Sequence, residues 1–294
     1  LLVNVRNGGI YYWDKTGGTT SRAVSLDSLA GASSTPTIAK QVLVSDRDRH
    51  IIAFGCDTES NPGVQDPLAI RFSSQESLTD WGATATNTAG ELRLGSGSEI
   101  VMAIETRQQV LVFTDESLYA MQYLGPPFTF GVNLVSENVT TISPLAAVPV
   151  EDNVFWMGLK EFYVYGGTVQ RLPCTVRDYV FEDINLNQRE KIVASSNTSF
   201  SEVWWFYPSA NSEVNDRYVV YNYQQQIWYY GTLSRTFWMD RGIFDRPIAA
   251  GPNNYLYTQE IGFDDDGAAF TAYIESSQID IGDGDKFAFI KRMI

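Results

Sequence analysis

Residues 189–223 read REKIVASSNTSFSEVWWFYPSANSEVNDRYVVYNY. A run of small and apolar residues at 191–195 leads to an aromatic run at 202–207 and, after a polar turn, to another at 217–223. Aromatic and β-branched side chains suit the pleated, half-buried surface of a strand. Adjacent Trp204 and Trp205 must point to opposite faces of one strand, so we expect both faces of this sheet to be covered. This segment predicts a sheet that is packed on both sides.

The same order of runs recurs along the chain. Units open near residues 98, 143, 189 and 246, which are 45, 46 and 57 residues apart. An earlier unit opens near residue 35, and one more strand is predicted at residues 9–13. Four-stranded propeller blades recur about every 40–50 residues. We therefore predict an all-β fold, a propeller-like repeat of four-stranded blades, five or six in number, of which those at the ends can be incomplete.

Strand patterns cover most of the sequence, and one short helix is predicted at residues 175–185. Four tryptophans within aromatic strands are predicted to lie in the core or between blades: Trp156, Trp204, Trp205 and Trp228. The other predicted strands are residues 41–44, 50–54, 69–72, 100–105, 109–114, 117–122, 154–158, 161–165, 227–230, 255–259 and 269–275. We predict one domain over residues 1–294, and because both ends fall within strand patterns we expect a fragment of a longer chain.

The net charge limits the partners of this protein. Twenty-one basic and 35 acidic residues give −14, so the surface repels phosphate backbones and tight nucleic-acid binding is not expected. No apolar run approaches the roughly 20 residues that cross a bilayer, so we expect no membrane insertion by this segment.

Few residues offer chemistry. His50, the only histidine, ends a charged turn at residues 45–50 and is interpreted as a solvated turn residue; Cys56 and Cys174 are interpreted as two buried thiols. Zinc sites built from His and Cys clusters are excluded by count, and no phosphate-binding glycine loop is present. Acidic loops at 264–267 and 280–285 suit calcium in part, but solvated hairpin loops are the simpler interpretation. We expect no enzymatic activity, no cofactor and no metal.

Several segments resemble known proteins. They are LGPPFTFG at 124–131, SDRDRHIIAFG at 45–55, DPLAIRFS at 66–73, FWMG at 155–158, LPCTVRDYVF at 172–181 and DIGDGD at 280–285. Together they resemble bacteriophage tail structural proteins, in particular the nozzle or tail-tube accessory proteins of short-tailed phages. The resemblance implies a virion tail protein that forms a sixfold ring below the portal and adaptor, around the channel through which DNA leaves. Nozzle subunits are longer than this chain.

From the resemblance we expect a homo-oligomeric ring, a hexamer if nozzle-like, that contacts other tail proteins such as the adaptor and fibres. DNA should pass without tight binding, and acidic loops should line the lumen. The candidate lumen residues are Asp264, Asp265, Asp266, Asp283 and Asp285. The alternative is a carbohydrate- or receptor-binding propeller of a tail protein, which exposed aromatics around a polar pocket would favour. A propeller glycosidase would need two carboxylates facing across such a pocket.

Overall fold

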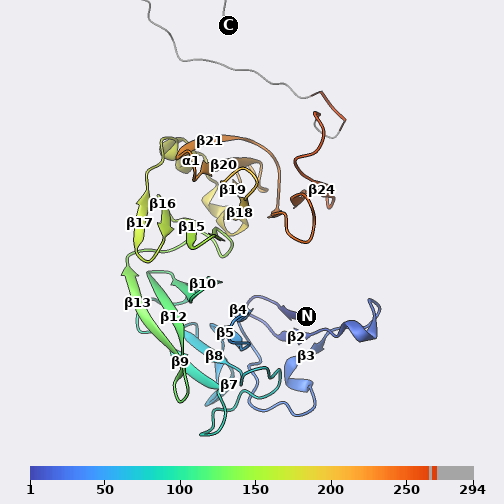
Figure 1. Ribbon diagram of the computed structural model, residues 1–294, viewed down its shortest axis with the longest axis vertical. Helices are drawn as coiled ribbons and strands as arrows, with labels where there is room; N and C mark the ends of the chain where they lie inside the picture. Colours follow the sequence, from blue (N-terminus) through green and yellow to red (C-terminus); the bar gives the residue numbers. More distant parts are fainter. Residues whose placement is uncertain (265–266, 270–294) are drawn as a thin grey trace, which may run out of the picture. The chain divides into compact units, whose positions relative to one another are not determined.

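The computed structural model describes residues 1–264 and 267–269. By its internal contacts the chain divides into Leu1–Gln259 and Glu260–Ile294. The first unit is a six-bladed β-propeller of antiparallel sheets (Figure 1). The all-β propeller prediction is therefore confirmed, with six blades in the described residues. All the strands that build these blades lie in the first unit, and the prediction of one domain stays a prediction for the residues after Gln259.

Each blade takes its strands in chain order. Blade 1 contains β1 (Leu2–Asn4), β2 (Ile10–Tyr12) and β3 (Val24–Ser25). Blade 2 contains β4 (Gln41–Val44), β5 (Ile51–Phe54), β8 (Ala69–Phe72) and β9 (Gly90–Arg93), with a separate hairpin of β6 (Asp57–Thr58) and β7 (Asn61–Gln65) between β5 and β8. Blade 3 contains β10 (Ile100–Glu105), β11 (Val110–Thr114), β12 (Ser117–Gly125) and β13 (Thr129–Glu137).

The second half of the propeller follows the same plan. Blade 4 contains β14 (Ala147–Val150), β15 (Asn153–Met157), β16 (Phe162–Tyr165) and β17 (Val169–Leu172). Blade 5 contains β18 (Val193–Asn197), β19 (Glu202–Tyr207), β20 (Arg217–Asn222) and β21 (Ile227–Thr232). Blade 6 contains β22 (Phe237–Met239), β23 (Ile248–Ala250) and β24 (Leu256–Thr258). The predicted helix is α1 (Arg177–Asp183), between blades 4 and 5, and short 3-10 turns are η1 (Lys15–Gly17), η2 (Leu26–Ser28) and η3 (Leu186–Lys191).

The first strand of each complete blade lies at the centre of the ring. Strand β10 contacts β4 and β14, and β18 contacts β14 and β22. An isolated parallel bridge between Leu145 and Val193 fixes the common direction of two neighbouring inner strands. The predicted opening of a blade at residue 246 is wrong, because that segment precedes β23, the second strand of blade 6. The inner strand of blade 6, β22, is Phe-Trp-Met and not a run of small residues, so it does not match the sequence pattern used to predict inner strands.

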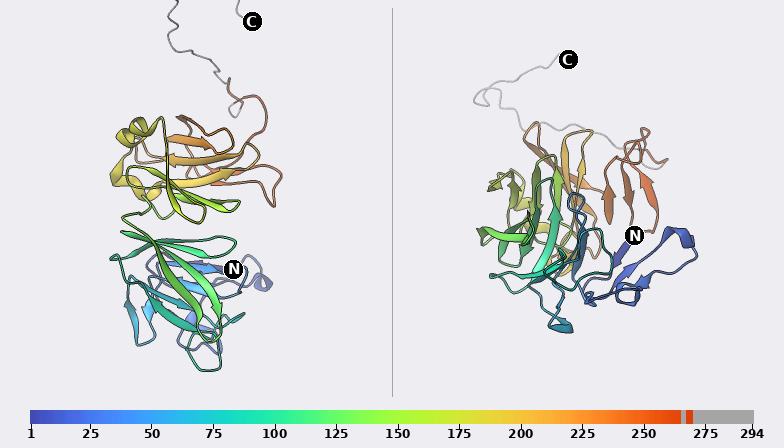
Figure 2. Two further views of the ribbon diagram at one scale, coloured as in Figure 1. Left: turned by 60° about the vertical axis from the view of Figure 1, so that its left-hand side comes forward. Right: turned by 60° about the horizontal axis from the view of Figure 1, so that its bottom comes forward.

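Tryptophan packing holds blade 5 between its neighbours, as predicted from the Trp204–Trp205 pair. The ring of Trp205 is fully buried and lies 4.9 Å from that of Phe162 in blade 4, centroid to centroid. Trp204 points the other way and stacks on Trp238 of blade 6, with centroids 5.3 Å apart and an interplanar angle of 13°. Trp156 is fully buried, and Trp228 is partly buried against the core of blades 4 and 5. The successive twisted sheets can be followed in Figure 2.

The prediction for His50 is wrong, because its side chain is fully buried. Its ring points between blades 2 and 3, where it meets Phe130 edge-on with centroids 5.1 Å apart. Its Nε2 lies 3.1 Å from Oγ1 of Thr88. Burial lowers the pKa of the His50 imidazole, because desolvation disfavours the charged ring.

A pH dependence follows from this burial. The unfolded chain takes up a proton on His50 near pH 6.5, whereas the folded chain resists protonation until a lower pH. The stability of the fold with a neutral His50 is therefore fully present above the unfolded pKa. Below that value the free energy of unfolding decreases as the pH falls, by at most about 1.4 kcal/mol per pH unit. We expect the free energy of unfolding, measured in denaturant from about pH 7 to pH 5, to fall more steeply for the wild type than for His50→Gln. An equal decrease in the free energy of unfolding for the two proteins would show that His50 does not take up a proton when the chain unfolds.

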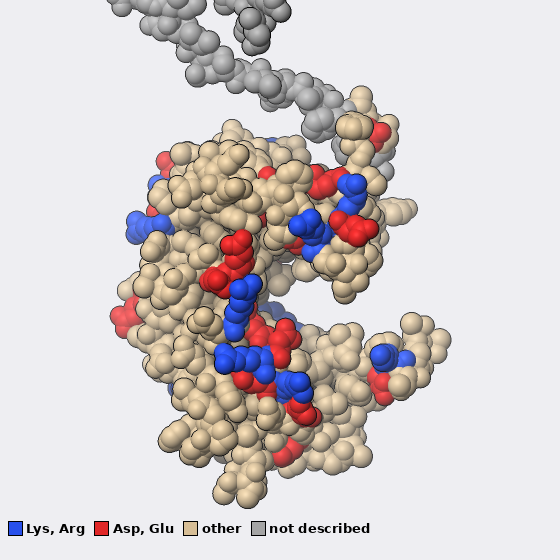
Figure 3. Space-filling model, viewed as in Figure 1, with Lys and Arg blue, Asp and Glu red and all other residues tan. Residues whose placement is uncertain are grey.

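The two end blades each have one exposed face. In blade 6, Trp238 faces blade 5, whereas Phe237, Met239 and Leu256 lie on the opposite face of the sheet and are 51%, 42% and 75% exposed. In blade 1, Ile10 packs toward blade 2, whereas Val3, on the other face, is 41% exposed. Figure 3 shows an open gap between these end blades. The described propeller therefore ends in two different sheet faces that its other blades leave exposed.

Candidate functional site

One face of the propeller carries the turns between the first and second strands of blades 2 to 5. The inner strands of these blades run in the same direction and each sheet is antiparallel and built in chain order, so these turns lie at one end of the four blades. We call this the turn face; it includes residues 45–50, 106–109, 151–152 and 198–201. Pockets open on it at four successive blade junctions, between blades 1 and 2, 2 and 3, 3 and 4, and 4 and 5.

The largest of these, the aromatic pocket, lies between blades 4 and 5 and has a volume of about 460 Å³. Seven of its twelve lining residues are apolar or aromatic: Val150, Phe155, Val164, Leu172, Pro173, Tyr221 and Tyr223. Phe155 and Tyr221 are buried, whereas Tyr223 is half-buried and presents part of its ring to solvent. The rings of Phe155 and Tyr223 are nearly parallel, at 26°, with centroids 6.2 Å apart.

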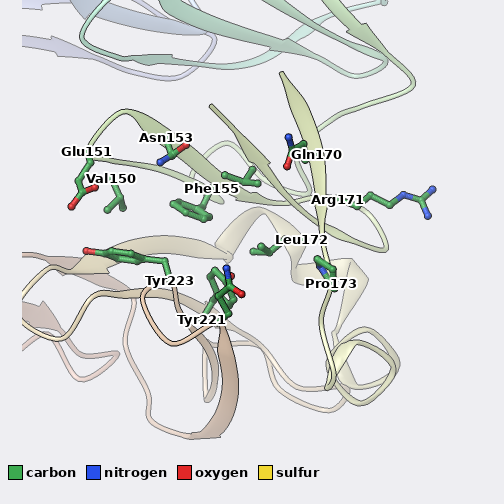
Figure 4. Close-up of a pocket in the computed structure, with 12 residues that line it drawn as sticks. Val150, Glu151, Asn153, Phe155, Gln170, Arg171, Leu172, Pro173, Tyr221 and Tyr223 are labelled. Carbon is green, nitrogen blue, oxygen red and sulfur yellow. The ribbon is translucent and has the colours of Figure 1, made fainter. Parts of the chain in front are cut away.

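Polar side chains surround the aromatic pocket: Glu151, Asn153, Gln170, Arg171 and Gln226. Figure 4 shows Asn153 and Phe155 on the blade 4 side, Tyr221 and Tyr223 on the blade 5 side, and Arg171 pointing away from the pocket. The three amides each offer a donor and an acceptor to a ligand. Polar groups make up more than half of the surface that lines the pocket, which suits a polar ligand.

A second pocket of about 390 Å³, the glutamine pocket, lies between blades 3 and 4. Its lining is polar and consists of Thr106, Arg107, Gln108, Gln109, Gln122, Asp152, Tyr165, Gly166 and Gly167. Nε2 of Gln122 donates to Oε1 of Gln109 over 2.8 Å, and Nε2 of Gln109 donates to the hydroxyl of Tyr165 over 2.7 Å. Arg107 and Asp152 form an exposed ion pair of 3.2 Å at the edge. These bonds hold the amide groups of the pocket in fixed positions.

Neither lining, over the residues that the structure describes, contains a pair of carboxylates. The aromatic pocket has Glu151, and the glutamine pocket has Asp152, which is paired with Arg107. A glycoside hydrolase needs two carboxyl groups across its substrate. Neither pocket therefore has the pair of carboxyl groups that the glycosidase interpretation requires.

Of the five predicted lumen residues, one lies among the residues that the structure describes. Asp264 is exposed in the second unit, where its Oδ1 accepts a hydrogen bond of 3.0 Å from the backbone of Gly267. Asp265, Asp266, Asp283 and Asp285 lie outside the described residues, as does the second acidic loop proposed for calcium. The acidic lumen stays a prediction. On the face seen in Figure 3, acidic and basic side chains are interspersed along the middle of the propeller.

Other candidate chemistry is limited in the described part of the chain. Within residues 1–264 and 267–269, no group of three His, Cys, Asp or Glu side chains is placed to hold a metal ion. Both cysteines are free; Cys56 is buried as predicted, but Cys174 is only half-buried. Burial raises the pKa of their thiols to about 12 and about 11, so both are protonated at neutral pH. No helix among these residues is long and apolar enough to cross a membrane.

Sequence reasoning missed both pockets. Their residues come from separate blades, such as Asn153 with Tyr223, and only the packing of the blades brings them together. The Tyr221 to Gln226 segment, YNYQQQ, was the available signal, since a turn rich in tyrosine and glutamine follows a buried strand. That pattern alone does not distinguish a binding wall from an ordinary turn.

Comparisons with known proteins do not assign the chain to a family. No family model matches the chain, and no curated protein matches it in sequence. Among solved structures, it is similar to a domain described as the extracellular domain of the one-component system BT4673 of B. thetaiotaomicron, with 11% identity and a TM-score of 0.48; the match covers 94% of this chain and 33% of that one. A second similar structure is the AfRom2 CNH domain, with 11% identity, a TM-score of 0.39 and coverage of 85% and 89%. The chain thus spans about a third of the first of these proteins.

Proposed function

We propose that this chain is a structural subunit of a bacteriophage tail, in a closed ring of identical copies around the channel through which DNA leaves. The sequence segments quoted above support the tail location, together with contacts to other tail proteins such as an adaptor and fibres. If the protein is nozzle-like, the ring is a hexamer. The geometry supports the assembly through the exposed faces of the two end blades.

The proposed ring depends on the two exposed end faces, which differ from each other and so allow a head-to-tail contact. The far face of blade 6, with Phe237, Met239 and Leu256, can receive the far face of blade 1, with Val3, of a neighbouring copy. Such a contact would extend the blade-on-blade packing already present within the chain. A head-to-tail contact between two different patches produces a closed ring when the rotation closes. Burial of the apolar side chains supplies the free energy of association.

The oligomeric state tests this proposal. We expect the purified protein to sediment as a ring, and Leu256→Glu to sediment as a monomer, because the substitution places a charge on the exposed apolar face of blade 6. The matched control is Leu186→Glu in η3, another exposed leucine outside both end faces, which should sediment like the wild type. A monomeric wild type, or a Leu256→Glu variant that assembles normally, would contradict the proposal.

The ring should not hold DNA. The net charge of −14 opposes contact with phosphates, and at physiological salt charges act over only about 8 Å. We expect no retention of fluorescent duplex DNA by the ring at moderate ionic strength, measured by anisotropy. Tight binding that weakens steeply with salt would count against a channel that lets DNA pass.

A second candidate function is recognition of a carbohydrate or another receptor. The observation that favours it is the aromatic pocket, whose lining combines the half-buried Tyr223 with the amides of Asn153, Gln170 and Gln226. The two functions are compatible, because the pocket and the end faces are built from different blades.

A further inference from the structure

We propose that the aromatic pocket and the glutamine pocket together bind one linear, uncharged oligosaccharide that crosses the turn between β14 and β15. This inference rests on the second candidate function and adds the class of ligand, its length and its path. One sugar ring would lie against Tyr223, and the sugars after it would reach Gln109 and Gln122.

The first argument is the position of the two pockets. They open on the same face at successive blade junctions, on the two sides of blade 4. Three consecutive residues at the turn between β14 and β15 contribute to both pockets: Glu151 and Asn153 line the aromatic pocket, and Asp152 between them lines the glutamine pocket. Consecutive Cα atoms are about 3.8 Å apart, so only a two-residue turn divides the pockets. An extended ligand longer than one sugar can therefore enter both.

The second argument is the chemistry of the aromatic pocket. A pyranose ring has a face of C–H groups, which packs on an aromatic ring, and a rim of hydroxyls, which need donors and acceptors. Tyr223 supplies the ring, with Phe155 and Tyr221 buried behind it. Asn153, Gln170 and Gln226 supply both donors and acceptors around it. Sugar hydroxyls both donate and accept hydrogen bonds, so they pair with these amides better than the charged groups of a ligand do.

The third argument is the glutamine pocket. The chain of hydrogen bonds from Gln122 through Gln109 to Tyr165 fixes the orientation of two amides and a phenol. Sites with polar groups held in place by other groups bind with less loss of side-chain entropy. Charges of both signs lie around the two pockets, since Asp152 is paired with Arg107. A strongly acidic or basic ligand gains little from such a surface, which favours a neutral glycan.

The test measures the affinity of the full chain for short and long members of three glucan and chitin series. The probes are maltose and maltohexaose, cellobiose and cellohexaose, and chitobiose and chitohexaose. Their binding is measured by ligand-observed saturation-transfer NMR and by calorimetry. We expect at least one series to bind, and its hexasaccharide to bind at least about tenfold more tightly than its disaccharide, because it fills both pockets.

Single substitutions separate the two pockets. Tyr223→Ala should abolish binding of both lengths, and Tyr223→Phe should keep it, because the ring and not the hydroxyl carries the contact. Gln122→Ala should weaken only the hexasaccharide. Tyr255→Ala, which removes an exposed tyrosine of blade 6, is the control and should change neither affinity. Circular dichroism would verify that each variant remains folded.

The outcomes distinguish this inference from the function on which it rests. If a disaccharide binds through Tyr223 but lengthening adds nothing, or Gln122→Ala leaves the hexasaccharide unaffected, the bridging path is wrong and recognition by the aromatic pocket stands. If no member of the three series binds, both are overturned.

Discussion

Replacing Trp205 with alanine is expected to lower the free energy of unfolding by about 3–5 kcal/mol. The ring is fully buried where blades 4 and 5 meet, against Phe162 at 4.9 Å and Trp228 at 5.9 Å between centroids. Its Nε1–H also donates to the backbone carbonyl of Ala146 over 3.0 Å, so truncation leaves both a cavity and a buried acceptor without this donor. Urea denaturation followed by circular dichroism measures the loss.

Trp13 provides the control for this prediction. It is only half-buried, at the edge of blade 1, and Trp13→Ala should cost clearly less than Trp205→Ala. A loss below about 1 kcal/mol for Trp205→Ala, which is typical of a partly exposed site, would contradict the packing of blade 4 on blade 5.

Replacing Arg71 with methionine is expected to cost about 1–3 kcal/mol or more, because it leaves several buried backbone carbonyls without their donor. The guanidinium is buried in blade 2, where it donates to the backbone carbonyls of Asp57 at 3.3 Å, Trp81 at 3.4 Å and Ser34. Its Nε lies 3.7 Å from a carboxylate oxygen of Glu91. Methionine retains much of the side-chain length but leaves these carbonyls without their donor.

Arg93 is the matched control for Arg71. It pairs with Asp66 over 2.7 Å but is 60% exposed, so Arg93→Met should cost less than about 1 kcal/mol. Equal losses for the two variants in the same urea titration would show that Arg71 acts as an ordinary surface ion pair.

The strands of the fold were largely predictable from the sequence. Inner and middle strands carry continuous apolar or aromatic runs, and β4, β8, β10 and β19 were predicted with the bounds they have in the structure. Of the outer strands, β9, β13 and β17 were missed: β17, Val-Gln-Arg-Leu, has two exposed polar residues at its centre, so its composition resembles a loop. His50 was misplaced because charged neighbours suggested solvent, whereas the direction of its side chain is set by packing on Phe130.

The candidate site was much less predictable than the strands. Composition indicated that tyrosines would be abundant, but whether Tyr223 lies in a core or a pocket depends on the neighbouring blade. The same holds for the glutamine pocket, where Gln122 and Asp152 come from different blades. Periodicity in the sequence predicts which residues share a face of one sheet. It does not predict the pockets that remain where two twisted sheets pack together.

The ring is the central claim, and electron cryomicroscopy of the purified full-length protein tests it most directly. The proposal predicts closed rings of identical subunits around an axial channel, with the Phe237 and Leu256 face of one copy against the Val3 face of the next. Isolated propellers in which blade 6 packs on blade 1 of the same chain would contradict it.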